Sequence, residues 1–388
     1  MPIAVYILGF LVFSQTTSEF MVAGIMPSLA KEFEVSFASI GYLVSAYALG
    51  MVLGGPILTL GLLKFSRKRA LLGLTIVFLI GQTIGALATN YETMMLARII
   101  TGIVSSASMG IAVAITLNIV DKNSTAKGVS IVLGGLMVAT AVGLPFAILF
   151  DQFFGWRSSF WAIVILVLIA TLLLFILIPS TPISDQLSVQ KELYAFKNYR
   201  LWAAYLTSVL ILGSTFAAFS YFTPILTELT GFDSFSIPFI LVIYGVATIV
   251  GNIVIGRLAD HFTLSITVVG LIVLTVTLII FALFVENPVI AIIAVIMIGL
   301  VGISMNPALV TRITRVAGTG TLVATVHNSV INVGIIIGSA IGGLTIQQGF
   351  GLVSPLWVGA FMALLGLISL LPIIRRDKIK TNNIKSYN

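Results

Sequence analysis

The sequence predicts an all-helical membrane protein in which twelve transmembrane helices form two six-helix bundles. Of its 388 residues, 59% are hydrophobic and only 9% are charged, and the mean hydropathy is +1.17. A soluble globular protein usually carries about 25% charged and about 45–50% apolar residues. No soluble domain of this length could bury so much apolar surface, so we expect the chain to lie in a lipid bilayer.

Twelve apolar stretches account for most of the chain. A membrane-spanning helix needs roughly 20 such residues. The expected spans are residues 3–26, 37–62, 70–89, 93–117, 128–150, 158–178, 201–225, 236–256, 265–285, 288–311, 321–346 and 353–374. Their long, unbroken apolar runs exclude a β-barrel, whose strands would alternate over about ten residues.

A polar stretch divides the spans six to six, which predicts four segments. These are an N-terminal six-helix bundle (1–178), a connector on the cytoplasmic side (179–200), a C-terminal six-helix bundle (201–374) and a basic cytoplasmic tail (375–388). Secondary transporters are often built in this way from internal repeats.

Residues recur between the two halves at a constant offset of 197. Pro27 matches Pro224 and Tyr47 matches Tyr244 in this register, which continues into the loop after the second span of each half. A shared register favours a parallel duplication. The alternative is chance matching in an apolar chain.

The basic residues predict how the chain is threaded. An even number of spans puts both termini on one side. The loops on that side and the tail hold all 20 Lys and Arg residues except Lys31, Arg98 and Arg157. The positive-inside rule therefore predicts a multi-pass protein of the cell membrane with both termini in the cytoplasm. This distribution also explains the net charge of +7 without a nucleic-acid partner. We expect the first span, which has no charged segment before it, to be an uncleaved anchor.

The composition excludes several kinds of site. There are no cysteines and only two histidines, so we expect neither thiol chemistry nor a metal site. No P-loop is present, which excludes direct use of ATP. An intramembrane enzyme would need clustered acids, bases or metal ligands, and a channel would need rings of like charge or a filter sequence. The spans contain neither pattern, so we expect a transporter that needs no cofactor.

Two ionisable residues, Glu19 and Arg98, lie well inside spans. A charge in the bilayer costs at least ~2.5–3.5 kcal/mol, so each needs a role or a partner. A rise of 1.5 Å per residue puts them roughly 10 Å and 8 Å below the same surface. We expect Glu19 to carry a proton and Arg98 to tune it. The alternative is a static ion pair that joins two helices. Glu228, Asp233 and Asp151 fall at outer helix ends or loops, where we expect them to be solvated.

Polar and adaptable apolar residues within the spans are tentative substrate contacts. Amides in hydrocarbon need partners, and methionine and aromatic side chains can form an adaptable lining. The tentative set is Gln15, Tyr47, Met109, Met137, Phe216, Tyr244, Met305, Asn306, Asn328 and Asn332. Core packing is the alternative for each of them.

Glycines at intervals of four residues predict close helix contacts. Gly334, Gly338 and Gly342 form such a series in the eleventh span, and Gly50 and Gly54 form a pair in the second. Small residues at this spacing let two helix backbones approach each other.

Several motifs carry a family resemblance. Gly256, Arg257 and Asp260 match the start of a loop motif of Gly, three residues and Asp. Arg98 and Gly102 fit an Arg-x-x-x-Gly motif, and Gly143 and Pro145 fit a loosened antiporter motif. The segment 19–27, at the end of the first span, is similar to one branch of the same family, the efflux branch named below. Over its whole length the chain resembles the major facilitator superfamily. More narrowly, it resembles the twelve-span drug:proton antiporters, in the branch of the arabinose-type and purine-type efflux permeases.

The resemblance implies a function as well as a fold. It implies proton-coupled efflux, by alternating access, of small organic molecules such as drugs, sugars or nucleosides. The proton gradient would supply the energy, and spans 1 and 4 would both line a central cavity. Gly256, Arg257, Asp260, Gly143 and Pro145 would serve conformational change. We expect a monomer whose partners are its substrate, protons and membrane lipids. An importer or a lipid flippase of the same fold is the alternative.

The first-half copy of the loop motif departs from the family pattern. Thr59 and Leu63 stand where Gly and Asp are expected. The charge-relay role usually given to this loop therefore does not carry over to the first half.

Overall fold

A computed structural model describes residues 1–62, 65–121, 125–179, 194–317 and 321–385, and every regular element within them is a helix. The elements are α1 (Ile3–Gly24), α2 (Met26–Glu32), α3 (Phe37–Gly61), α4 (Arg67–Ala86), α5 (Tyr91–Ile119), α6 (Thr125–Val138), η3 (Ala139–Gly143), α7 (Leu144–Phe154), α8 (Trp156–Leu177), α10 (Tyr199–Phe219), α11 (Phe222–Pro224), η4 (Ile225–Leu229), η5 (Ser234–Ser236), α12 (Ile237–Leu283), α13 (Pro288–Val301), η6 (Ile303–Met305), α14 (Asn306–Ala317), α15 (Thr321–Thr345), η7 (Ile346–Phe350) and α16 (Ser354–Lys385).

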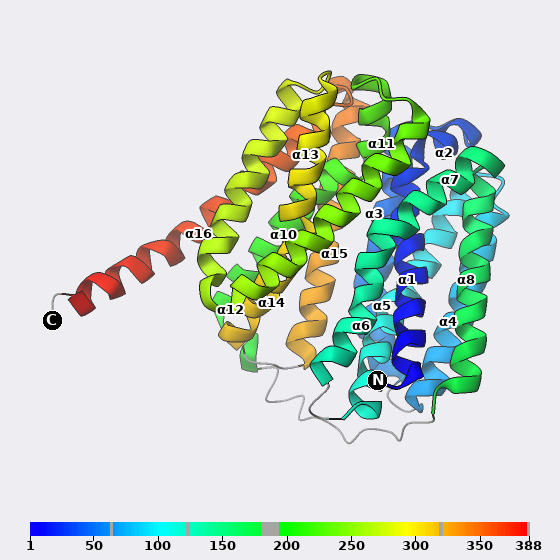
Figure 1. Cartoon of the computed structure of the whole chain (residues 1–388), viewed down its shortest axis with the longest axis horizontal. Helices are drawn as coiled ribbons and strands as arrows, with labels where there is room; N and C mark the ends of the chain where they lie inside the picture. The colour runs from blue at the N-terminus through cyan, green and yellow to red at the C-terminus, as the bar shows by residue number, and fades with distance from the viewer. Residues whose placement is uncertain (63–64, 122–124, 180–193, 318–320, 386–388) are drawn as a thin grey trace.

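The helices stand side by side, with α1–α8 in one group and α10–α16 in the other (Figure 1). Twelve helical segments of the described residues are long and apolar enough to cross a membrane, which confirms the predicted number of spans. Helices are expected because lipid offers no hydrogen bonds, so the backbone must satisfy its own N–H and C=O groups. Most of the predicted connector, residues 180–193, lies outside the described residues. Helix α16 runs on from the last span through much of the predicted tail.

The two bundles repeat one close backbone contact. A Cβ atom added to Gly102 on α5 would collide with the carbonyl oxygen of Tyr47 on α3. In the second bundle, a Cβ atom added to Gly299 on α13 would lie 2.8 Å from the carbonyl oxygen of Tyr244 on α12. The two contacts are related by the same offset of 197 residues, as a duplication predicts.

The seventh span ends earlier than the sequence predicted. Helix α10 stops at Phe219, the chain turns at Tyr221, and it resumes as α11 and the π-helix η4. Pro224 explains the break, because proline has no N–H and its ring crowds the preceding helical turn. Pro27, its counterpart in the first half, likewise lies in a short helix that follows the end of α1.

Spans 8 and 9 are joined without the predicted loop. Helix α12 includes both, and the chain turns at Phe262, whose φ of −124° and ψ of 32° are not helical. Residues 257–264 contain neither Gly nor Pro, which would favour a longer loop, so the helix continues on both sides of the turn.

Span 10 is interrupted near its middle. Gly302 leaves the helical conformation, a short 3-10 turn follows, and α14 begins at Asn306. Asn306 and Pro307 begin α14 directly after the interruption. The sequence analysis placed Arg312 in a loop, but the structure buries that side chain within α14.

The hydrogen bonds that join the two bundles lie toward one end of the molecule. We call the end near Ile3, Leu177 and Tyr199 the terminal end, and the end with α2 and α11 the distal end (Figure 1). Helix α3 packs along α15, and α12 packs against η3 and α7.

Three hydrogen bonds join the bundles in the distal half, and in one of them Gln152 Nε2 on α7 donates to the carbonyl oxygen of Ser234 at 2.5 Å. The Ser45 and Ser339 hydroxyl groups lie 2.6 Å apart, and the Tyr42 hydroxyl donates to Gln347 at 3.2 Å. Tyr221 adds a steric contact, because its hydroxyl fills the space that a side chain at Gly41 would occupy.

Candidate functional site

The Arg98 guanidinium lies inside the N-terminal bundle with 1% of the residue exposed. Its Nη1 atom donates to the carbonyl oxygen of Ser18 at 2.7 Å, and its Nη2 atom donates to the carbonyl oxygen of Glu19 at 3.0 Å. The guanidinium carbon lies 4.2 Å from the centre of the Tyr47 ring. Arg98 on α5 is therefore held by the backbone of α1 and by an aromatic face on α3.

The local sequence of α5 explains how Arg98 reaches this place. Asn90 caps the helix, and its side chain accepts a hydrogen bond from the Thr93 backbone N–H at 2.8 Å. Gly102 lies one turn after Arg98 on the same helix face, where the absence of a side chain lets α3 approach closely. The Arg-x-x-x-Gly spacing thus brings the Tyr47 ring onto the guanidinium.

Glu19 lies at the depth of Arg98, but its carboxylate is not paired with it. The single ion pair among the described residues joins Arg157 to Glu32, so the Glu19 carboxylate lies beyond ion-pair distance of the guanidinium. Glu19 is partly exposed, whereas its neighbours Ser18 and Phe20 are buried. The acid therefore keeps accessible surface next to a cation whose position is fixed.

Gln15 and Tyr47, two of the predicted substrate contacts, join this cluster. The Tyr47 hydroxyl donates to the carbonyl oxygen of Gln15 at 3.2 Å, and both residues are buried. The Nε2 atom of Gln15 is enclosed and has no hydrogen-bond partner. Gln15 precedes Glu19 by one helical turn, so the two side chains share a face of α1.

Two residues of the site were missed by the sequence analysis. The Ser18 hydroxyl donates to Oε1 of Gln82 on α4 at 2.7 Å, and both side chains are buried. Gln82 is an amide within a span, and that criterion had singled out Gln15. It could therefore have been found by the same argument, but its partner could not.

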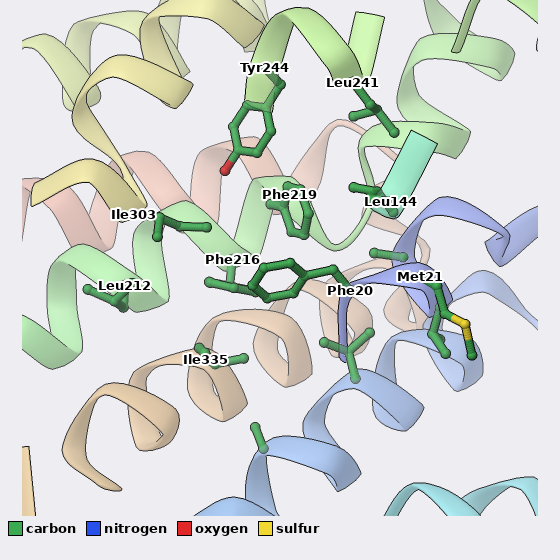
Figure 2. Packing of buried hydrophobic residues seen from close by; sticks show 14 of the residues in the cluster. Phe20, Met21, Leu144, Leu212, Phe216, Phe219, Leu241, Tyr244, Ile303 and Ile335 are labelled. Carbon is green, nitrogen blue, oxygen red and sulfur yellow. The ribbon is translucent and has the colours of Figure 1, made fainter. Parts of the chain in front are cut away.

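Phe216 meets Phe20 of the first bundle at the boundary between the halves, and Tyr244 joins the same group of rings through Phe219. The Phe20 ring on α1 lies 5.9 Å from Phe216 and 5.7 Å from Phe219, and the Phe219 and Tyr244 rings are 5.2 Å apart. Figure 2 shows these rings packed together, with Ile303 and Ile335 nearby. All four rings are buried, so in this conformation they close the boundary.

The remaining predicted substrate contacts do not gather at the Arg98 cluster. Asn332 donates to the carbonyl oxygen of Asn328 at 2.9 Å within α15. Met305 is buried against Gly270 of α12, inside the second bundle. Met109, Met137 and Asn306 are half-buried.

Gly143 and Pro145 lie where α6 gives way to α7. The residues between these helices form the π-helix η3, which ends at Gly143. A side chain at Gly143 would collide with the Thr17 hydroxyl on α1. π-Helical turns often mark functional sites in helices, so this irregular segment lies directly against the helix that carries Glu19.

The second-half loop motif lies at the turn of α12. Gly256 is half-buried and faces Pro307, and Arg257 is exposed. The side chain of Asp260 lies outside the described part of the structure. Among the described residues, no three His, Asp or Glu side chains are grouped as a metal site would require.

Comparison with known proteins decides the family. The family model described as Major Facilitator Superfamily matches residues 8–330. The chain belongs to the Major Facilitator Superfamily. It is therefore a multi-pass membrane transporter and not an enzyme.

Relatives within the superfamily include proteins named for drug resistance, for membrane transport and for probable sugar efflux. The chloramphenicol resistance protein of Streptomyces lividans is 28% identical, over 96% of each chain. The inner membrane transport protein YdhP of Escherichia coli K12 is 32% identical, over 91% of each chain. A probable sugar efflux transporter of Mannheimia succiniciproducens is 27% identical, over 94% of this chain and 92% of its own.

Solved structures of the superfamily share the fold. A bacterial homologue of the human lysosomal transporter Spinster, crystallised in an inward-facing and occupied conformation, superposes with a TM-score of 0.75 at 15% identity, over 96% of both chains. A mutant of the nucleoside transporter NupG superposes with a TM-score of 0.76 at 16% identity, over 95% of this chain and 98% of its own. At these identities the likeness concerns the fold alone.

Proposed function

We propose that this protein exports small organic molecules in exchange for protons, with Glu19 as the proton carrier. The observation that carries the proposal is the unpaired Glu19 carboxylate. The Arg98 guanidinium donates its hydrogen bonds to the backbone carbonyl oxygens of Ser18 and Glu19. The Glu19 carboxylate is therefore free to gain and lose a proton. A static ion pair between the two residues would have placed their charged groups in contact.

The fixed charge of Arg98 makes the protonation of Glu19 sensitive to the conformation of the protein. A nearby positive charge favours the carboxylate, and burial favours the neutral acid. Any movement of α1 relative to α5 changes the balance between these effects. The π-helix η3 and Gly143, which lie against α1, supply a place where such a movement can be accommodated. Protons would therefore bind in one conformation and leave in the other.

The distal contacts support an exchange mechanism with two conformations. Ser45–Ser339, Tyr42–Gln347 and the buried Phe20 cluster close the distal half. We propose that the terminal end faces the cytoplasm, in keeping with the positive-inside rule. The conformation described above then has its outer side closed. The outward-facing state would separate these same contacts.

The substrate class is proposed from the relatives and from the buried rings. Drugs, sugars and nucleosides are the candidates, and the relatives support the first two, since they include a chloramphenicol resistance protein and probable sugar efflux transporters. Aromatic side chains such as Phe20, Phe216 and Tyr244 would offer apolar contact once the boundary opens. We propose a monomer in the cell membrane that uses the proton gradient and needs no cofactor.

Inside-out vesicles provide the test. We expect vesicles that contain the protein to take up at least one of labelled chloramphenicol, a pentose and a nucleoside when a proton gradient is imposed. A protonophore should abolish this uptake, and vesicles without the protein are the control. Uptake that persists in the protonophore, or uptake only in right-side-out vesicles, would favour the alternative of an importer or a flippase.

A further inference from the structure

Gln82 is a buried amide on α4 that the mechanism above does not use. Only 1% of the residue is exposed, and its Oε1 atom accepts a hydrogen bond of 2.7 Å from the Ser18 hydroxyl. Its Nε2 atom is enclosed and has no partner. A buried amide that is only half satisfied costs free energy, so its presence within a span calls for an explanation.

Ser18 connects Gln82 to the guanidinium of Arg98. The Ser18 carbonyl oxygen accepts from Arg98 Nη1 at 2.7 Å, and the Ser18 hydroxyl oxygen lies 3.4 Å from the same nitrogen. The side chain of Ser18 is therefore held by α4 while its backbone holds α5. The chain of contacts Gln82–Ser18–Arg98 joins three helices at the level of Glu19.

We propose that Gln82 is a positioning residue for the proton site. Through Ser18 it holds the Arg98 guanidinium on the α1 backbone and out of ion-pair contact with the Glu19 carboxylate. The inference rests on the proposed role of Glu19 and adds the residue that keeps this acid unpaired. Without Gln82, the Ser18 hydroxyl would turn to a carbonyl of its own helix, as serines in helices often do, and the guanidinium would be free to approach the acid.

The charged and titratable groups near Glu19 are few. Arg98 lies beside it on α5, and the Tyr47 ring on α3 stacks on that guanidinium. Helices α6 and α8 also pack against α1, but their cations Lys127 and Arg157 lie in the first turns of these helices, and Arg157 pairs with Glu32. On α7, which also packs against α1, Asp151 accepts a hydrogen bond from Ser28 at the distal end. Among the described residues, Arg98 is thus the cation whose position governs the charge of Glu19.

Infrared difference spectra of the full-length protein in liposomes test the proposal with the proton itself as the ligand. The carbonyl band of a protonated carboxylic acid is followed through a pH series and assigned to Glu19 by its loss in Glu19→Gln. In Gln82→Leu we expect the midpoint of this band to move to lower pH by roughly one unit, the size of effect that a close opposite charge produces. Ser18→Ala should move it in the same direction.

Thr75→Val is the matched control. Thr75 is also buried on α4, but its hydroxyl donates to the Leu72 carbonyl of its own helix. The Glu19 carbonyl band of this variant should therefore keep the native midpoint. A native midpoint in folded Gln82→Leu and Ser18→Ala would overturn the inference. Should Gln82→Leu fail to fold, Ser18→Ala alone decides. A band that survives Glu19→Gln would instead overturn the proposed proton carrier, and with it the inference.

Discussion

Ser45 on α3 and Ser339 on α15 hold their hydroxyl oxygens 2.6 Å apart across the boundary between the two bundles. Both residues are buried in the distal half, near the place where Tyr221 fills the space beside Gly41. An alternating-access mechanism requires these contacts to separate and re-form in every cycle. The pair therefore offers a direct way to hold the transporter in one state.

A disulfide between these positions should lock the distal end. The chain has no native cysteine, and a disulfide bond length of about 2.05 Å is within reach of the present separation. We expect Ser45→Cys/Ser339→Cys to cross-link under oxidation, to lose transport, and to regain it on reduction. The single variants, which cannot cross-link within one chain, should transport under both conditions. Full transport by the oxidised double variant would show that the distal contact does not open.

The glycine series on α15 should be intolerant of side chains. A Cβ atom at Gly338 would collide with the carbonyl oxygen of Gly213 on α10, and overpacking typically costs about 1–3 kcal/mol. We expect Gly338→Leu to lower the unfolding temperature or the folded yield. Gly73→Leu is the matched control, because no heavy atom lies within 4 Å of a Cβ atom at that position. Equal stability of the two variants would contradict the close contact.

The ion pair at the distal surface should give a small, pH-dependent stabilisation. Arg157 donates to Glu32 Oε1 at 2.7 Å, and this hydrogen bond lowers the pKa of Glu32 from its usual 4.5. A lowered pKa stabilises the fold above the usual value and loses this effect as the pH falls through the lowered one. The side chains of Arg157 and Glu32 are 41% and 39% exposed, so the gain should not exceed about 1 kcal/mol.

Glu32→Gln tests this stabilisation. The variant should unfold more easily than the native protein at neutral pH, and the difference should vanish in acid. Glu34→Gln, which alters an exposed acid two residues away, is the control. A difference that grows on acidification would have the wrong sign for this ion pair.

Labelling should establish the threading in the membrane. Asn90 caps α5 at the distal end, whereas Asn388 is the last residue of the sequence. In a cysteine-free background, an impermeant thiol reagent should reach Asn90→Cys from outside the cell and Asn388→Cys only after the membrane is opened. Labelling of both from the same side would reject the proposed orientation.

The spans were predictable because lipid imposes a simple requirement on sequence. Apolar length alone located all twelve, and the 197-residue register anticipated the repeated contacts of Gly102 with Tyr47 and of Gly299 with Tyr244. Helix arithmetic also placed Arg98 at the level of Glu19, where it bonds the Glu19 carbonyl oxygen.

What the sequence could not supply depends on packing between helices. The depth of two residues does not say whether a guanidinium bonds a carboxylate or a backbone carbonyl. The Arg98 guanidinium bonds the backbone carbonyl oxygens of Ser18 and Glu19. The partnership of Ser18 with Gln82 requires knowledge of which face of α4 meets α1. The reversal between spans 8 and 9 was predicted, but its tightness at Phe262 was not, because the sequence there contains neither Gly nor Pro to mark a single turning residue.

Transport by Glu19→Gln in inside-out vesicles tests the central claim most directly. Glutamine keeps the shape of the side chain but cannot exchange a proton. With a probe that the native protein accumulates, such as labelled chloramphenicol, we predict that Glu19→Gln loses uptake driven by a proton gradient. It should retain the exchange of labelled for unlabelled probe without a gradient. Gradient-driven uptake that survives this substitution would contradict the account, and the proton carrier would then have to be sought among Asp151, Glu228 and Asp233.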